Sequence, residues 1–235
     1  MEYTGKDLII ATGAPGSRWS GSLRAITSNV DINTSDEHED LIYDNDPGTT
    51  NRKTTIGWHR GAYWGPYHRQ GQNFDNIDKM SKDEIISEFR KPFADFDPGI
   101  KIIKSHWFAY HLDFLKETFP DAKFLAVYMP DDFCFDWWHS VGGWKITYPH
   151  YDWYKDDERM KKQISIENTN IKKFFELKSY SAKETFKALG LSDMCKPLDE
   201  LFKQDYKFEE LMTEYQKDFD GLLDMVISNR QMGIL

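Results

Sequence analysis

Cysteine is scarce in this chain, which has only Cys134 and Cys195 among its 235 residues. Two cysteines cannot form the disulfide framework typical of small secreted proteins, so we expect a reducing compartment. Long apolar runs are also lacking, because no stretch approaches the roughly 18 residues that a membrane span needs. The segment Met1–Thr4 lacks the basic and then apolar pattern of a signal peptide. We therefore expect a soluble, cytoplasmic protein without a membrane partner.

An excess of basic residues is missing too, since the formal net charge is −9. Binding to a nucleic-acid backbone needs a basic face, so nucleic acid is excluded as the main partner. A small anionic ligand in one locally positive pocket remains compatible with this charge. The chain has no internal repeat, and its 40% hydrophobic and 15% aromatic content is enough for one packed core. We expect a single domain over residues 1–235.

The N-terminal region has the order of elements with which α/β proteins bind phosphate. Leu8–Ala11 is a short apolar run that predicts a buried strand, Thr12–Ser17 is a turn of small residues, and Arg18–Ile26 has helical character. Glycines let the backbone approach an anion, and a helix start offers unpaired N–H groups. The turn is not a Walker A motif, and a plain strand-to-helix turn remains the alternative. The residues of this candidate anion loop are Gly13, Ala14, Pro15, Gly16, Ser17, Arg18, Trp19 and Ser20.

A second region reads as a complete crossover unit. Residues 100–103 predict a strand, apolar positions from Phe108 to Phe119 predict a helix, and residues 124–128 predict a second strand. Two apolar strands joined by a helix indicate parallel pairing. Ligands collect at the carboxyl ends of parallel strands, so we expect residues 13–18, 104–106 and 129–132 on one rim of the sheet.

Three side chains of this rim could carry chemistry. His106 could take a proton from an attacking hydroxyl, while Lys104 and Arg18 could stabilise charge on a leaving group. A purely structural histidine is the alternative. His111 is five residues beyond His106 and falls off the same helical face, so we expect no metal site there. The candidate catalytic residues are therefore His106, Lys104 and Arg18.

The other segments are assigned more coarsely. The aromatic, glycine-rich stretch Gly57–Phe74 and the aromatic stretch Trp144–Tyr154 are interpreted either as ligand-contacting loops or as loops packed on the core. A capping-box spacing at Ser81–Glu84 predicts a helix to about Arg90. Residues 155–235 are predicted to be mainly helical scaffold, with one helix ending at Gly190 and another over residues 208–226.

Three anchors within residues 7–145 resemble the sulfotransferases that use 3′-phosphoadenosine 5′-phosphosulfate (PAPS). Residues 12–19, TGAPGSRW, look like the 5′-phosphosulfate loop of that family. Residues 104–106, KSH, are similar to its Lys-Thr-His, whose histidine is the general base. Residues 119–128, FPDAKFLAVY, look like its strand leading to the 3′-phosphate site. The order and separation of the three anchors agree with the family.

The resemblance implies a three-layer α/β sandwich with a mostly parallel, P-loop nucleoside-triphosphate-hydrolase-like sheet and a helical C-terminal part. It implies transfer of a sulfuryl group from PAPS to a hydroxyl or amine of a small-molecule or carbohydrate acceptor, without a metal. Ala14 stands where the family has its loop lysine, and Met129 and Trp137 stand where it has an arginine and a serine for the 3′-phosphate. Two alternatives therefore stay open, namely a catalytically altered nucleotide-binding protein of the same fold and a small-molecule kinase with Asp131 or Asp132 as metal ligand.

Overall fold

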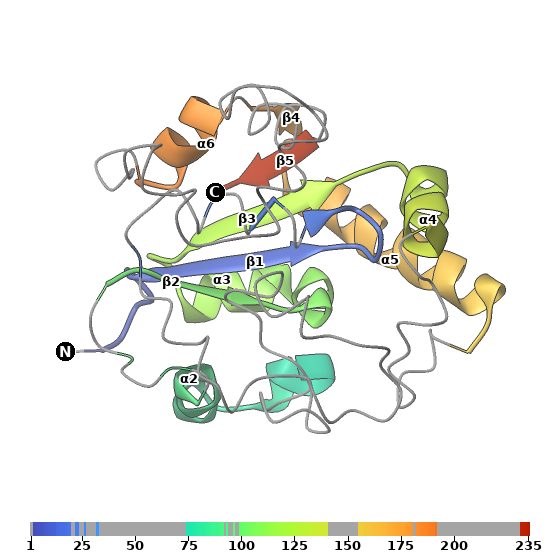
Figure 1. The fold of residues 1–235 in the computed structure, drawn as a ribbon. Coiled ribbons are helices and arrows are strands. Elements are labelled where there is room, and N and C mark those ends of the chain that lie inside the picture. The colour runs from blue at the N-terminus through green and yellow to red at the C-terminus, as the bar shows by residue number, and fades with distance from the viewer. Residues whose placement is uncertain are drawn as a thin grey trace.

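The computed structural model describes residues 2–19, 22–23, 26, 32, 74–91, 93, 96, 99–140, 155–180, 182–191 and 231–235. The centre of the molecule is a five-stranded open sheet with the strand order β2-β1-β3-β5-β4 (Figure 1). Its strands are β1 (Leu8–Gly13), β2 (Lys101–Lys104), β3 (Lys123–Tyr128), β4 (Lys178–Ser179) and β5 (Gln231–Ile234).

The three central strands confirm the predicted parallel pairing. Ile10 of β1 lies opposite Ile103 of β2 on one side and opposite Phe124 of β3 on the other. All residues of β1 and β2 are buried, which explains the unbroken apolar run at the start of β1. In β2 two buried lysines flank the apolar pair Ile102 and Ile103. Because the three strands are parallel, their carboxyl ends meet at one edge of the sheet. The segments that follow Gly13, Lys104 and Tyr128 therefore share that edge, as predicted.

The helices begin and end with ordinary signals. Ser81 accepts a hydrogen bond from the N–H of Glu84, and the Glu84 carboxylate accepts one from the N–H of Ser81, so the predicted capping box is confirmed.

No helix in the described part of the chain is long and apolar enough to cross a membrane. The helices are the 3-10 helices η4 (Phe74–Lys79) and η5 (His106–Tyr110), and the α-helices α2 (Lys82–Arg90), α3 (Leu112–Thr118), α4 (Asp131–Ser140), α5 (Asp157–Phe174) and α6 (Ala182–Ala188).

Apolar side chains cover both faces of the sheet. Successive residues of β1 point to opposite faces, so Leu8 and Ile10 enter one cluster with α2 and α3, while Ile9 and Ala11 enter another with α6. Figure 1 shows α2 and α3 on one side of the sheet and α6 on the other. A third, smaller cluster joins Ala14 of the loop after β1 to α4 and α5. This cluster holds the loop at the edge where the parallel strands end.

The crossover between β2 and β3 differs in detail from the predicted single helix. It begins as η5 and continues as α3 after His111, whose φ of −129° and ψ of 25° interrupt the helix. The predicted apolar stripe is nevertheless buried as a whole, since Phe108, Leu115 and Phe119 are all fully enclosed. η5 follows β2 after the single residue Ser105, so His106 lies at the start of η5 beside the end of the strand.

The C-terminal region differs from the helical scaffold predicted for residues 155–235. α5 and α6 are helical, but β4 and β5 belong to the sheet, and β5 pairs antiparallel with β3. Gly233 makes this pairing possible, because a Cβ atom built there would lie 2.2 Å from Cβ of Phe175. The predicted helix over residues 208–226 and the two aromatic stretches lie outside the described residues, apart from Phe74 at the start of η4.

Candidate functional site

The loop after β1 forms a tight turn with two residues in the left-handed conformation. The N–H of Ser17 donates to the carbonyl of Ala14 at 3.0 Å, which closes a tight turn. Gly16 and Arg18 both have positive φ, 78° and 62° respectively. A left-handed conformation is uncommon for a residue with a side chain, so the strain at Arg18 marks the loop as a candidate functional segment.

Glycine is required at position 16 for a second reason, which is contact with α4. A Cβ atom built on Gly16 would lie 1.8 Å from the carbonyl oxygen of Cys134, a backbone atom that cannot swing aside. Ala14 is fully buried in the cluster with Cys134 and Trp138. The position at which the resemblance expects a lysine therefore faces packed helix. Burial raises the pKa of the Cys134 thiol to about 12, so this cysteine is no nucleophile at neutral pH.

Ser17 has a buried hydroxyl with no hydrogen-bond partner among the described residues. Its Oγ lies 2.9 Å from a Cβ atom built on Gly13, so this glycine also lets the loop fold tightly over the end of β1. An unpartnered buried hydroxyl costs about 1–3 kcal/mol. A loop that carries this cost, with N–H groups beside it, is suited to a ligand with oxygen acceptors.

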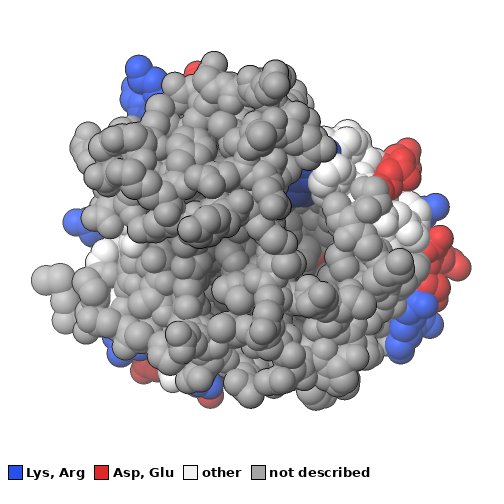
Figure 2. All heavy atoms as spheres, in the orientation of Figure 1, with Lys and Arg blue, Asp and Glu red and all other residues white. Residues whose placement is uncertain are grey.

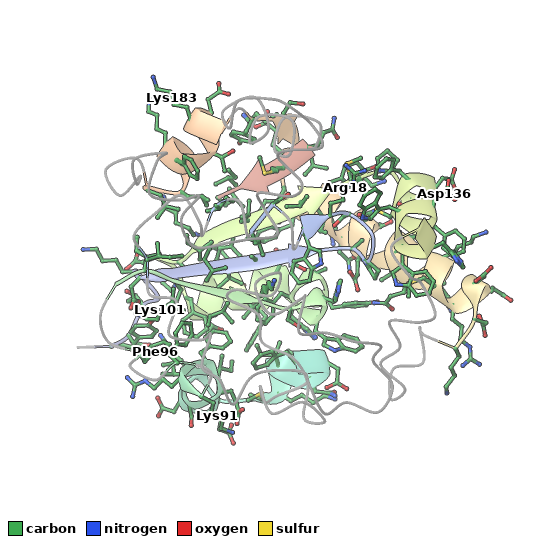
Figure 3. The ribbon with its side chains drawn as sticks, viewed as in Figure 1. Arg18, Lys91, Phe96, Lys101, Asp136 and Lys183 are labelled. Atoms are coloured by element: carbon green, nitrogen blue, oxygen red, sulfur yellow. The ribbon has the colours of Figure 1, made fainter. Side chains whose placement is uncertain are left out.

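Arg18 turns toward α4. Its guanidinium carbon lies 3.6 Å from the centroid of the Trp137 ring and 5.1 Å from that of Phe133. Figure 3 shows Arg18 between the end of β1 and α4, and Asp136 on the outer side of that helix. In Figure 2 a few Lys or Arg atoms are visible in a hollow beside α4, while acidic side chains gather toward the outer edge. The aromatic contacts hold the arginine charge at the loop.

Lys104 and Ser105 are fixed at the end of β2. The hydroxyl of Thr12 donates to the carbonyl of Ser105 at 3.0 Å, and the N–H of Ser105 donates to the carbonyl of Ala11 at 3.2 Å. The Ser105 hydroxyl accepts from the N–H of Trp107 and so caps η5. Lys104 is 1% exposed, which is unusual for a lysine. These bonds tie the end of β2 rigidly to β1.

Trp19 joins the loop to the end of β2. Its ring centroid lies 4.6 Å from that of the His106 ring, and Lys104 Nζ lies 5.4 Å from the Trp19 ring. The structure thus brings Lys104 and His106 of the predicted rim together with Trp19, which lies one residue beyond it. Arg18 has its aromatic partners on α4 instead, and Ser20 lies outside the described residues.

His106 has a partner that the sequence motifs do not indicate. Its Nδ1 lies 3.3 Å from Oε2 of Glu167, a fully buried carboxyl group on α5. The side-chain amide of Gln163 donates to the other carboxyl oxygen at 2.6 Å. A signal is nevertheless present, because Glu167 stands three residues after Ile164 and four before Ile171, on the apolar face of the helix. A carboxylate inside an apolar stripe indicates a buried partner, because an unpaired buried charge is strongly unfavourable.

Burial dominates the electrostatics of this carboxyl group. It raises the pKa of Glu167 above its usual range, while the charge and hydrogen bond of His106 and the hydrogen bond from Gln163 oppose that rise. Burial also raises the pKa of the Tyr110 hydroxyl, and the nearby Glu167 adds to that rise. A buried carboxyl group beside an imidazole is an arrangement found at sites of proton transfer.

The end of β3 is neutral or acidic in its described part. The carbonyl of Met129 accepts from Asn168 Nδ2 at 2.9 Å and from the Cys134 thiol at 3.3 Å. Asn168 also donates to Asp131 at 2.7 Å, so this carboxylate already has a partner. Within the described segments, no group of three or more His, Cys, Asp or Glu side chains is arranged to hold a metal ion.

Comparisons with protein-family models, with curated proteins and with solved structures gave no match to this chain.

Proposed function

We propose that this chain is a sulfotransferase with a P-loop nucleoside-triphosphate-hydrolase-like fold, acting in the cytoplasm. It would transfer a sulfuryl group from PAPS to a hydroxyl or amine of a small-molecule or carbohydrate acceptor. One observation carries the proposal: the ends of β1 and β2 hold an anion-type loop, a buried lysine and a histidine around Trp19. A base, a cation and a phosphate-type loop at one sheet edge are the groups that such a transfer needs.

The loop would bind the 5′-phosphosulfate of the donor. Backbone N–H groups after Gly16 and the hydroxyl of Ser17 supply donors for anionic oxygens. Arg18 adds positive charge, fixed by its aromatic contacts on α4. Trp19 would separate the anion from the core and present a flat surface near His106.

The transfer itself needs one base and one cation. His106 would take the proton of the acceptor hydroxyl as the new bond from the acceptor oxygen to sulfur forms. The bond from sulfur to the bridging phosphate oxygen breaks, and that oxygen keeps the electron pair. Lys104 would stabilise the resulting negative charge, as cations do in related in-line phosphoryl transfers.

A nucleotide-binding protein without catalysis is the second candidate. The contact between Arg18 and Trp137 favours it, because Trp137 stands where the resemblance expects a serine for the 3′-phosphate. The described residues that directly follow β3 also carry no cation, since Met129 is followed by Pro130, Asp131 and Asp132. Such a protein would bind nucleotide through the loop and leave it unchanged.

Calorimetric titration with adenosine 3′,5′-bisphosphate, beside AMP and ATP, tests the donor. We expect the bisphosphate to bind at least tenfold more tightly than AMP, which is about 1.4 kcal/mol. Equal affinities would remove PAPS as the donor. Transfer of labelled sulfate from PAPS to any member of an acceptor set then separates the enzyme from the binding protein, which would bind the bisphosphate but give no labelled product.

A further inference from the structure

Burying the carboxyl group of Glu167 is energetically unfavourable for the fold. Its side chain is fully buried on the face of α5 that also buries Met160, Ile164 and Ile171. An apolar residue of similar volume would fill this place without the cost of removing a carboxylate from water. Residues that cost stability in this way are most often retained where they serve a site.

The two carboxyl oxygens of Glu167 have different partners. One carboxyl oxygen lies 3.3 Å from His106 Nδ1, and the other accepts from Gln163 at 2.6 Å. Gln163 lies four residues before Glu167 on the same helix and also forms a side-chain hydrogen bond with Tyr110 of η5, so it fixes the carboxyl group from the side away from His106. The Trp19 ring packs against the imidazole. The imidazole is thus held by a carboxyl group at one nitrogen and by an aromatic ring beside its plane.

We propose that Glu167 is the positioning residue of His106: it keeps the imidazole proton on Nδ1, which makes Nε2 the proton acceptor. The site is thereby suited to acceptor hydroxyls that are too weakly acidic to ionise in water. The inference about the acceptor rests on the proposed sulfuryl transfer, whereas the inference about the tautomer does not. A carboxylate in this position stabilises the imidazolium that forms when Nε2 takes a proton. An aliphatic alcohol needs that assistance, and an acceptor that is already an anion does not.

The proton balance follows from this arrangement. The acceptor hydroxyl gives its proton to Nε2, and the imidazolium then carries protons on both nitrogens while Glu167 keeps its negative charge. The acceptor oxygen forms its bond to sulfur, and the leaving phosphate oxygen takes the electron pair of the broken bond. His106 later releases the Nε2 proton to water, which restores the starting tautomer.

The tautomer is tested without any substrate. Long-range proton–nitrogen correlation spectra of the nitrogen-labelled protein distinguish a protonated from an unprotonated ring nitrogen, and loss of a signal in His106→Gln assigns His106 among the seven histidines. We expect a protonated Nδ1 and an unprotonated Nε2 in the wild type. An unprotonated Nδ1 would overturn the proposal. Glu167→Gln should move the proton toward Nε2, because the new amide can donate to Nδ1. Glu158→Gln, an exposed site on the same helix, is the matched control and should leave the His106 signals unchanged.

The acceptor class is tested by transfer from PAPS to two probes, an aliphatic alcohol and a phenol whose own pKa lies below the assay pH. Glu167→Gln should slow transfer to the alcohol by about 10²–10⁴-fold, the usual contribution of an acid–base group. It should change transfer to the ionised phenol by less than about threefold, since no proton has to be removed. Equal loss with both probes would show a structural role and overturn the proposal. Absence of transfer to either probe by the wild type would reject the sulfuryl transfer and the acceptor class with it, while the spectra still decide the tautomer.

Discussion

Arg18 and Trp137 form the closest cation–aromatic contact in the described part of the site, with the guanidinium carbon 3.6 Å from the ring centroid. The contact explains how an arginine in a strained, left-handed conformation is held beside the loop. It also gives Trp137 a role that the comparison of motifs does not suggest. The aromatic ring positions a cation of the candidate anion loop from a neighbouring helix.

Replacing Trp137 should therefore weaken anion binding without unfolding the protein. Trp137 is partly exposed on α4, so Trp137→Leu leaves the core intact but removes the ring face under Arg18. A cation–aromatic contact contributes about 0.5–2 kcal/mol, so the Kd for adenosine 3′,5′-bisphosphate should rise about two- to thirtyfold. Trp137→Phe keeps a ring face and should lie close to the wild type. Identical affinities of the leucine and phenylalanine variants would contradict this role.

Gly16 and Gly190 provide a matched pair for the packing of the loop on α4. Both have positive φ, 78° and 72°, but only Gly16 faces backbone atoms. Alanine at Gly190 should cost about 1 kcal/mol of unfolding free energy, which is the conformational penalty alone. Alanine at Gly16 should cost about 2–4 kcal/mol, because Cys134 must also shift. Urea unfolding of the two variants measures the difference, and equal costs would show that the loop can move away from α4.

His106 should be needed for turnover rather than for donor binding. His106→Ala removes the base but leaves the loop from Gly13 to Arg18 in place, so transfer should fall below detection while bisphosphate affinity changes by less than about threefold. Calorimetry measures the bisphosphate affinity, and a labelled-sulfate assay measures the rate of transfer. Equal loss of affinity and turnover would assign His106 to structure, through its contact with Trp19.

The sequence predicts the core of the fold well because the central strands are buried on both faces. Apolar runs such as Leu8–Ala11 have few other places in a folded domain, and the chain order of strand, helix and strand implies parallel pairing. The rim follows from that pairing alone. The pairing explains why Lys104, at the end of β2, lies near the segment that follows β1, from which Trp19 contacts it.

Two features escape prediction because they depend on long-range packing. Glu167 meets His106 across 61 residues of sequence, and the sequence of its helix indicates an apolar stripe but not what the stripe packs against. β5 has just four residues and includes a glycine, so its strand character comes from pairing with β3 and from the fit of Phe175 against Gly233. Local secondary-structure propensity predicts neither the contact between Glu167 and His106 nor the pairing of β5 with β3.

Glu167→Gln should make the protein more stable as well as less active, and the gain should depend on pH. Burial raises the pKa of Glu167, so between its unfolded and its folded pKa the native state holds a proton that the unfolded state has lost. Stability of the wild type therefore falls as pH rises through this window, and the glutamine variant lacks that loss. We expect an advantage of about 1 kcal/mol or more for the variant at neutral pH, and none at pH values where Glu167 is protonated in both states.

The stability measurement must account for the other titratable groups near Glu167. These are His106 and Tyr110 on η5 and Cys134 on α4. The raised pKa values of Tyr110 and Cys134 keep both groups neutral from pH 4 to 8. Urea unfolding over this range, with the double variant carrying His106→Gln as well, separates the effect of burying Glu167 from that of its contact with His106. A variant less stable than the wild type at every pH would show that Glu167 stabilises the fold.

A second ion pair, between a buried lysine and a partly exposed aspartate, lies at the opposite end of the strands and should contribute to stability only. Lys101 is fully buried, and its Nζ donates to Asp7 at 2.5 Å and to the carbonyl of Gly99 at 2.7 Å (Figure 3). Lys101→Met leaves Asp7 without its cation, so it should lower the unfolding free energy by about 1–3 kcal/mol. Asp7→Asn should lower the unfolding free energy by a similar amount. The double variant should lower it by less than the sum of the two, because it leaves no charged group without its partner. Additive costs in urea unfolding would show that the pair does not act as a unit. Bisphosphate affinity should stay unchanged in all three variants, since Lys101 lies at the start of β2 and the candidate site lies beyond its end.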